Sequence, residues 1–140
     1  MTRDDTLKWL LRIIGGVELL AIPFTFIPFS WMAAIHDRLP GLGALPPGAV
    51  VEYMARGMSA MYALHGALVF FASTDVDRFR PMIRFLGFVH TAFGLAIIAI
   101  DASAGLPLWW IVGEGPGIAF GGVLTIALSR ERPADRGLVQ

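Results

Sequence analysis

Ionisable side chains interrupt the long apolar segments of this sequence, and they are its strongest candidates for chemistry. They are Glu18, Glu52, Arg56, His65, His90, Asp101 and Glu114. A charged group is costly inside a bilayer, so such residues usually mark proton relays, ion sites or ligand sites. Carboxylates outnumber cations in this set, and in a low dielectric they cannot all be ionised. The excess of acid therefore predicts protonated carboxylates, a bound cation, or water entering from one side.

Helical spacing predicts how some of these groups pair. Glu52 and Arg56 are four residues apart and should form an ion pair on one helix face. One interpretation of this pair is a clamp that fixes helix register, and the other is a ligand contact. Asp101 falls near a helix end, where it is either solvated or part of a site. Glu114 lies in the sequence GEGPG, which should break its helix, and broken helices are typical of transporter binding sites.

At about 1.5 Å of depth per residue, most of the predicted ligand-binding residues lie in the outer half of the apolar segments, with Glu18 near mid-depth and His90 in the inner half. Trp109 and Trp110 should cover them as an aromatic lid. His90 is included because it shares a helix face with Asp101. His65 is left out, because it lies on the opposite side of its helix from Arg56. The predicted set is Glu18, Glu52, Arg56, His90, Asp101, Trp110 and Glu114.

Established catalytic and cofactor motifs are missing. The sequence has no P-loop, no GxGxxG after a strand, no HExxH and no nucleophile elbow. It has no cysteine, and no two histidines have metal-ligand spacing along a helix. We therefore predict no metal site and no cofactor, and we assign no catalytic residue. The net charge of zero gives no general attraction to nucleic acid, so none is expected as a partner.

Four apolar segments are long enough to cross a bilayer, which takes about 20 residues in a helix. The chain is 56% apolar with a mean hydropathy of +0.66. Connectors rich in proline, glycine or charge separate the segments, at residues 36–48, 74–81 and 102–107. Short connectors favour antiparallel neighbours. We predict an all-α, single-domain protein of residues 1–140, an antiparallel four-helix membrane bundle with spans at residues 7–32, 49–73, 82–102 and 106–129.

Lysine and arginine are distributed unequally between the two sides of this bundle. Nine lie on one side: Arg3, Lys8, Arg12, Arg78, Arg80, Arg84, Arg130, Arg132 and Arg136. Arg38 and Arg56 lie on the other. The positive-inside rule therefore predicts that both ends are cytoplasmic, with residues 130–140 as a cytoplasmic tail. Tryptophans support this topology, since Trp9 falls at the predicted inner interface and Trp31, Trp109 and Trp110 fall at the outer one.

Proline and glycine predict where the helices bend and where they touch. Pro23 and Pro28 should kink the first helix. Gly113, Gly117 and Gly121 form a small-xxx-small ridge on the fourth helix, which is typical of close helix packing. Small and polar residues also form one stripe on each of the other helices: Gly15, Glu18, Ile22 and Thr25; then Ser59, Ala63 and Gly66; then Gly87, His90, Gly94 and Asp101.

Three segments carry a resemblance to a known group of proteins. They are VEYMARGMSAMYALHG at residues 51–66, DRFRP at residues 77–81 and GLPLWWIVGEGP at residues 105–116. In these segments the chain resembles small bacterial membrane proteins with four spans, a group without an assigned activity. In size and topology it is loosely similar to the DoxX-like families. The resemblance implies a four-span fold in the bacterial inner membrane, and it implies no functional residue.

Three functions are compatible with these features. The first is binding or transport of a proton, a small cation or an amphipathic ligand in an outward-facing polar cavity. The second is a structural subunit that packs against a copy of itself or another membrane protein. The third is an intramembrane enzyme acting on a lipid, with Glu114 or Asp101 as acid and His90 as base. We favour the first function. All three functions require the lipid bilayer as a partner.

Overall fold

The computed structural model describes residues 2–130, and all of its regular structure in that range is helical. The helices are α1 (Arg3–Leu19), α2 (Ile22–Phe26), α3 (Phe29–Asp37), α4 (Ala49–Ala72), α5 (Val76–Ala104), α6 (Leu108–Gly113) and α7 (Gly115–Ser129). The all-α prediction is therefore confirmed. The predicted tail at residues 131–140 lies outside the described residues.

Three helical stretches are long and apolar enough to cross a membrane. They are Arg3–Phe26, Val76–Ala104 and Leu108–Ser129, which is compatible with a multi-pass membrane protein. The predicted span at residues 49–73 does form a helix of 24 residues, α4. It is not among the three, since Glu52, Arg56 and His65 lower its mean hydropathy.

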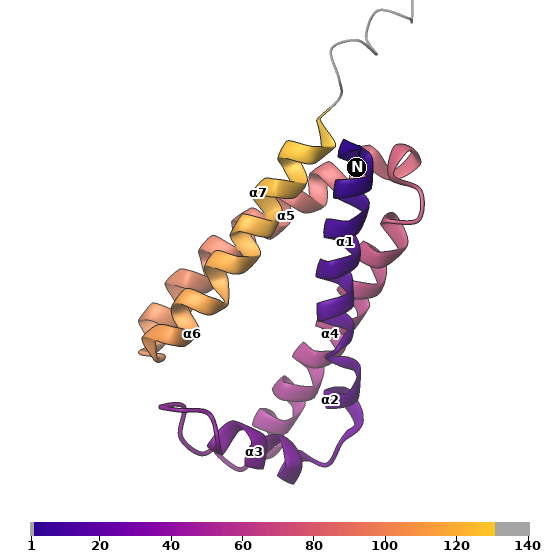
Figure 1. Cartoon of the computed structure of the whole chain (residues 1–140). Helices are drawn as coiled ribbons and strands as arrows, with labels where there is room; N and C mark the ends of the chain where they lie inside the picture. The colour runs from indigo at the N-terminus through magenta and orange to yellow at the C-terminus, as the bar shows by residue number, and fades with distance from the viewer. Residues whose placement is uncertain (1, 131–140) are drawn as a thin grey trace, which may run out of the picture.

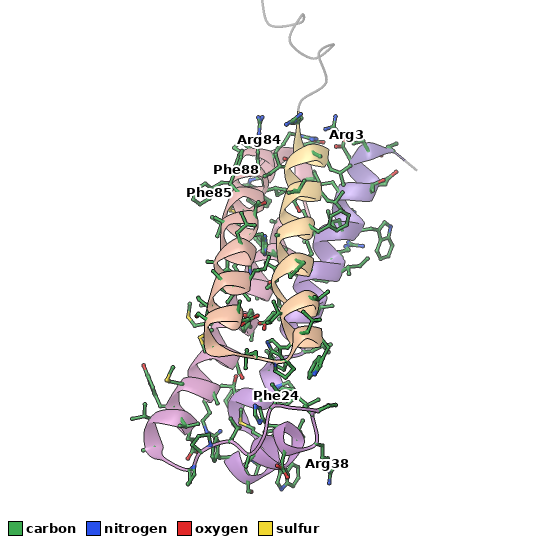
Figure 2. The ribbon with its side chains drawn as sticks, turned by 90° about the vertical axis from the view of Figure 1, so that its left-hand side faces the viewer. Arg3, Phe24, Arg38, Arg84, Phe85 and Phe88 are labelled. Atoms are coloured by element: carbon green, nitrogen blue, oxygen red, sulfur yellow. The ribbon has the colours of Figure 1, made fainter. Side chains whose placement is uncertain are left out.

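Successive helices run back and forth between two ends of the molecule, so segments far apart in the sequence meet at each end. At one end Arg80 binds the Asp4 carboxylate at 3.0 Å, and Arg3 donates to the backbone oxygen of Ala127. At the other end the Trp109 indole donates to the backbone oxygen of Pro40 at 2.9 Å. Figure 2 shows Arg3 and Arg84 at the first end and Arg38 at the second. The first end, called the cationic end below, therefore gathers residues that the sequence placed on one side of a bilayer.

The long helices form two closely packed pairs, α1 with α4 and α5 with α7 (Figure 1). Glycines allow the close approach. A Cβ atom on Gly15 would lie 2.7 Å from the Gly66 backbone oxygen, and one on Gly94 would lie 2.4 Å from the Ala119 nitrogen. Both distances are shorter than van der Waals contact, so a side chain at either glycine would push the paired helices apart.

The glycine ridge predicted on the last helix does not lie on the face that contacts α5. A Cβ atom on Gly113 or Gly117 would meet nothing within 4 Å. Gly115 and Gly122 contact α5 instead: their added Cβ atoms would lie 2.8 and 2.6 Å from the backbone oxygens of Gly94 and Gly87. Gly115, Gly117, Gly121 and Gly122 all lie in α7, so helical spacing offered two glycine faces and could not show which of them meets α5.

An apolar core joins the two pairs near the cationic end. It contains buried residues of α1, α4 and α5: Leu7, Leu11, Val69, Ala72, Val76, Ile83 and Leu86. Away from this core the pairs diverge toward α2, α3 and α6 (Figure 1). Few side chains therefore bridge the two helix pairs beyond this core. The side chains that do so form the candidate functional site.

The first predicted span differs from the structure because prolines break it. Residues 7–32 were expected to form one kinked helix, but α1 ends at Leu19 and the helical path stops at Ile27. Ile27 has ψ of 154°, the extended backbone expected for a residue that precedes proline. Pro28 then begins α3, which leaves the direction of α1 and α4 (Figure 1).

Two further boundaries follow from local capping. The connector at residues 74–81 was expected to be a loop, but α5 starts at Val76 because the Asp75 side chain accepts from the Arg78 amide at 3.1 Å. Pro81 is accommodated inside this helix. The predicted break in GEGPG is confirmed, since α6 ends at Gly113 and α7 begins at Gly115.

The α5–α7 contact can be tested with alanine at two glycines. Gly94→Ala should lower the thermal unfolding temperature of the purified protein, at a cost of about 1–3 kcal/mol, because the new methyl group meets α7 backbone. Gly117→Ala is the matched control, because its added Cβ meets nothing within 4 Å. Circular dichroism melts in lipid nanodiscs measure both variants. Equal melting of the two would contradict the packing described here.

Candidate functional site

A carboxylate and two imidazoles from three helices meet inside the molecule. The Glu18 carboxylate of α1 contacts Nδ1 of His65 on α4 at 2.8 Å. Its other oxygen lies 3.6 Å from Nε2 of His90 on α5. The two imidazole rings lie edge to face, with their centroids 4.8 Å apart. We call Glu18, His65 and His90 the polar cluster; it contains side chains from both helix pairs.

Small residues next to the polar cluster explain how it forms. Gly66 follows His65, and an added Cβ on Gly66 would lie 2.7 Å from Cβ of Glu18. This close approach of α1 and α4 brings the Glu18 carboxylate within hydrogen-bond distance of His65. His90 stands between Gly87 and Gly94, the two glycines of α5 that contact α7. Helix packing therefore fixes the position of each of the three side chains.

His90 is a buried polar group without a partner. It is only 6% exposed, and neither of its ring nitrogens makes a hydrogen bond in the described part of the chain. Its approach to Glu18 is longer than a normal hydrogen bond. Buried side-chain nitrogens are nearly always satisfied in folded proteins, and exceptions often mark functional groups or bound ions. The geometry thus leaves His90 with unused capacity to bind, facing the Glu18 carboxylate.

A second polar group lies between the cluster and the end where α6 begins. The Trp110 indole donates to the Glu114 carboxylate. The Tyr62 hydroxyl lies beside Glu114. The carboxyl groups of Glu18 and Asp101 are also near the Tyr62 hydroxyl. Asp101 is 5% exposed and keeps one carboxylate oxygen without a partner. Polar side chains therefore continue from the Trp110 end toward the polar cluster.

The pair predicted between Glu52 and Arg56 is present, but it lies apart from the cluster. Arg56 Nε donates to Glu52 at 2.9 Å, and its Nη1 donates to the backbone oxygen of Thr25 at 2.9 Å. Within residues 2–130, no ion pair or hydrogen bond is found between Arg56 and Asp101 or Glu114. The contact with Thr25 favours the interpretation of this pair as a structural clamp between α2 and α4.

The predicted set therefore separates into three groups. Glu18 and His90 belong to the polar cluster, Asp101, Trp110 and Glu114 to the second group, and Glu52 and Arg56 to the clamp. Whether any of these residues binds a ligand stays a prediction. Sequence reasoning missed His65 and Tyr62. The histidine had a detectable signal, since it directly precedes Gly66 on the small-residue stripe, but its partner on α1 could not be known from spacing within α4.

The remaining histidine lies elsewhere. His36 lies in the last turn of α3, where its Nδ1 contacts the backbone oxygen of Gly43 at 2.8 Å. This contact belongs to the loop at the end opposite the cationic end. His36 is therefore separate from the polar cluster and provides an internal control for experiments on histidine.

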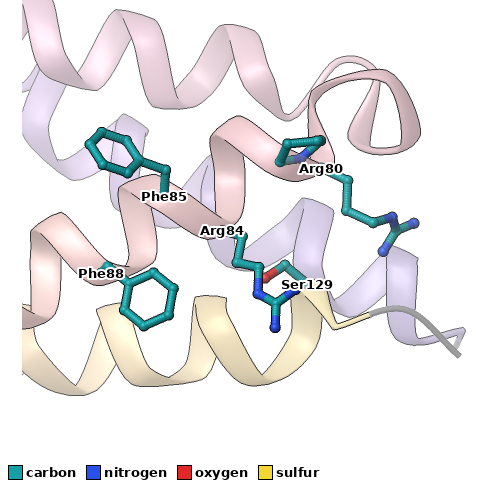
Figure 3. A pocket seen from close by; sticks show the side chains of 6 residues that line it. Arg80, Arg84, Phe85, Phe88 and Ser129 are labelled. Atoms are coloured by element: carbon teal, nitrogen blue, oxygen red, sulfur yellow. The ribbon is translucent and has the colours of Figure 1, made fainter.

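A surface hollow of about 340 Å³ lies at the cationic end, away from the polar cluster. It is lined by Arg80, Pro81, Arg84, Phe85, Phe88 and Ser129. Figure 3 shows Arg84 extending toward Ser129, with Phe85 and Phe88 farther along α5. Arg80 is already paired with Asp4 and Asp77. Guanidinium groups beside exposed phenyl rings are typical of the level of lipid headgroups, so this hollow fits contact with lipid.

Comparisons with protein-family models, with curated protein sequences and with solved structures found no match. The resemblance to four-span bacterial membrane proteins therefore stays a prediction. The chemistry of the site rests on its own geometry. One carboxylate and two imidazoles offer anionic oxygen and neutral nitrogen lone pairs, which together suit a proton or a cation.

Proposed function

We propose that this chain is a multi-pass membrane protein that binds a proton or a small cation at the polar cluster. The observation that carries the proposal is the buried, unpartnered His90 facing the Glu18 carboxylate across the two helix pairs. Within apolar helices, an ionisable residue without a partner is expensive and is therefore a functional candidate. A bound cation would interact with the carboxylate and with both imidazoles at once.

The second polar group supports access from one end. Tyr62 precedes His65 by three residues on α4 and lies near Glu114, which Trp110 contacts. These side chains could pass a proton or a hydrated cation from the α6 end toward Glu18. The other direction, toward the cationic end, is filled by the apolar core of Leu7, Leu11 and their neighbours. This asymmetry favours a site that opens to one face of the bilayer.

The proposal includes four spans with both described ends in the cytoplasm. The support for α4 as a span is its length of 24 residues, about 36 Å against a hydrocarbon core of about 30 Å. It also lies alongside α1 through the contact of Gly15 with Gly66. The cationic end contains Arg3, Arg80 and Arg84, and the positive-inside rule places such an end in the cytoplasm. The α6 end would then face outward.

Cation binding at the cluster can be tested by infrared difference spectroscopy on the protein in supported bilayers. Exchange of the buffer between pH 8 and pH 5 should change carboxyl and imidazole bands in the wild type. Glu18→Gln should remove or alter these bands, because it removes the group that contacts both imidazoles. Glu52→Gln is the control, since Glu52 belongs to the separate clamp. Identical difference spectra for wild type and Glu18→Gln would refute the proposal.

The proposed topology can be tested with single cysteines, because the natural chain has none. Ala44→Cys and Thr74→Cys place thiols at exposed loop positions at opposite ends. In intact bacterial cells, a membrane-impermeant maleimide should label Ala44→Cys and should label Thr74→Cys only after the cells are opened. Both variants are scored on gels after labelling. Labelling of both thiols in intact cells would contradict α4 as a span, and labelling of Thr74→Cys alone would contradict the proposed orientation.

A further inference from the structure

The donor atoms of the polar cluster are close enough to share one ion. One ligand atom from each of Glu18, His65 and His90 can be chosen so that all lie within 4.8 Å of one another. The donors come from three long helices: Gly15 and Gly66 bring α1 and α4 to backbone contact, and the apolar core joins both helices to α5. The residues therefore form a set positioned by packing.

His90 gives the second, independent indication of a ligand. Its side chain is more than nine-tenths buried, and both ring nitrogens are unpartnered. A proton shared between Glu18 and His65 accounts for their 2.8 Å contact. That proton does not satisfy His90, whose Nε2 is 3.6 Å from the other carboxylate oxygen. A group that accepts lone pairs from both imidazoles would satisfy His90 as well.

We propose that Glu18, His65 and His90 bind one divalent transition-metal ion of the zinc class. Each imidazole would supply one ring nitrogen and Glu18 one carboxylate oxygen, leaving a fourth position for water or another ligand. This inference rests on the proposed function and names the class of cation. Two imidazoles with one carboxylate are a donor set for zinc, copper, nickel or iron, whereas calcium and magnesium prefer oxygen ligands alone.

The three donor atoms lie within 4.8 Å of one another, so side-chain movements of about 1.5 Å or less would bring them to the spacing of a bound ion. A tetrahedral ion with bonds of about 2.0–2.1 Å holds its donors about 3.3 Å apart. His65 lies 2.8 Å from one oxygen of Glu18, and His90 lies 3.6 Å from the other. A rotation of the carboxylate would bring a single oxygen within reach of an ion held by both imidazoles. The ion would replace the hydrogen bond to His65 and would give His90 the partner that it lacks.

The charges around the cluster also favour a divalent cation. Glu18 neutralises one of its two positive charges. Two further carboxyl groups, Asp101 and Glu114, lie on the α6 side of the cluster. The bound ion would also cross-link the two helix pairs where the apolar core does not reach. Metal binding should therefore raise the unfolding temperature of the whole chain.

The test is equilibrium binding of zinc to the full chain in lipid nanodiscs, with cobalt absorption reporting coordination geometry. The wild type should bind one zinc per chain and give the visible spectrum of four-coordinate cobalt. His65→Gln and His90→Gln should each weaken binding more than about 100-fold, since loss of even an outer partner of a metal ligand costs about 10–100-fold. His36→Gln should bind as the wild type does, because His36 lies in a separate loop contact.

Two controls keep the outcomes separate. Circular dichroism and gel filtration show whether each variant is folded. The two histidines lie on different helix pairs, so if one variant misfolds the other still tests the metal site. Wild-type zinc affinity equal to that of folded His65→Gln or His90→Gln would overturn the metal site. If the pH-dependent infrared bands at Glu18 then remained, the proton-binding proposal would stand without a metal. If both signals were absent, the two proposals would fail together.

Discussion

Glu18 is a carboxylate inside apolar helices, and its partners lie on both helix pairs. Its contacts with His65 and His90 link α1 to α4 and α5 at a level where the apolar core no longer joins the pairs. The glycine contacts matter for this reason: they bring the helices close enough for short polar side chains to meet. The polar cluster therefore depends on packing: the contact of Gly15 with Gly66 brings Glu18 to His65, and the apolar core brings α5 near α1 and α4.

Much of the fold could be predicted from the sequence, because hydropathy and turn residues are local signals. The segments that became α4 and α5, and the break at Glu114, were all visible in the pattern of apolar residues, glycine and proline. The errors came from local chemistry that competes with hydropathy. Pro28 redirected the chain into α3, and the Asp75 cap started α5 within an expected loop. The face of α7 that packs was missed because α7 carries glycines on two faces, and spacing along one helix does not show which face meets α5.

The site was only partly predictable, because its partners lie on different helices. Spacing along one helix found Glu52 with Arg56, which is a local pair. Spacing could not show that Glu18 lies next to His65, 47 residues later in the chain. It also could not show that Arg56 would be committed to Thr25 of the neighbouring helix. Pairing across helices depends on which faces pack. The positions of Gly15 and Gly66 in the sequence do not show that these two glycines face each other.

The central claim is that Glu18 contacts the two imidazoles of the polar cluster within the bilayer. Solid-state nitrogen NMR on histidine-labelled protein in bilayers tests it most directly, since the chain has only three histidines to assign. Glu18→Gln should shift the imidazole signals of both His65 and His90 while leaving those of His36 unchanged. Unchanged His90 signals in that variant would contradict the bridge between the two helix pairs.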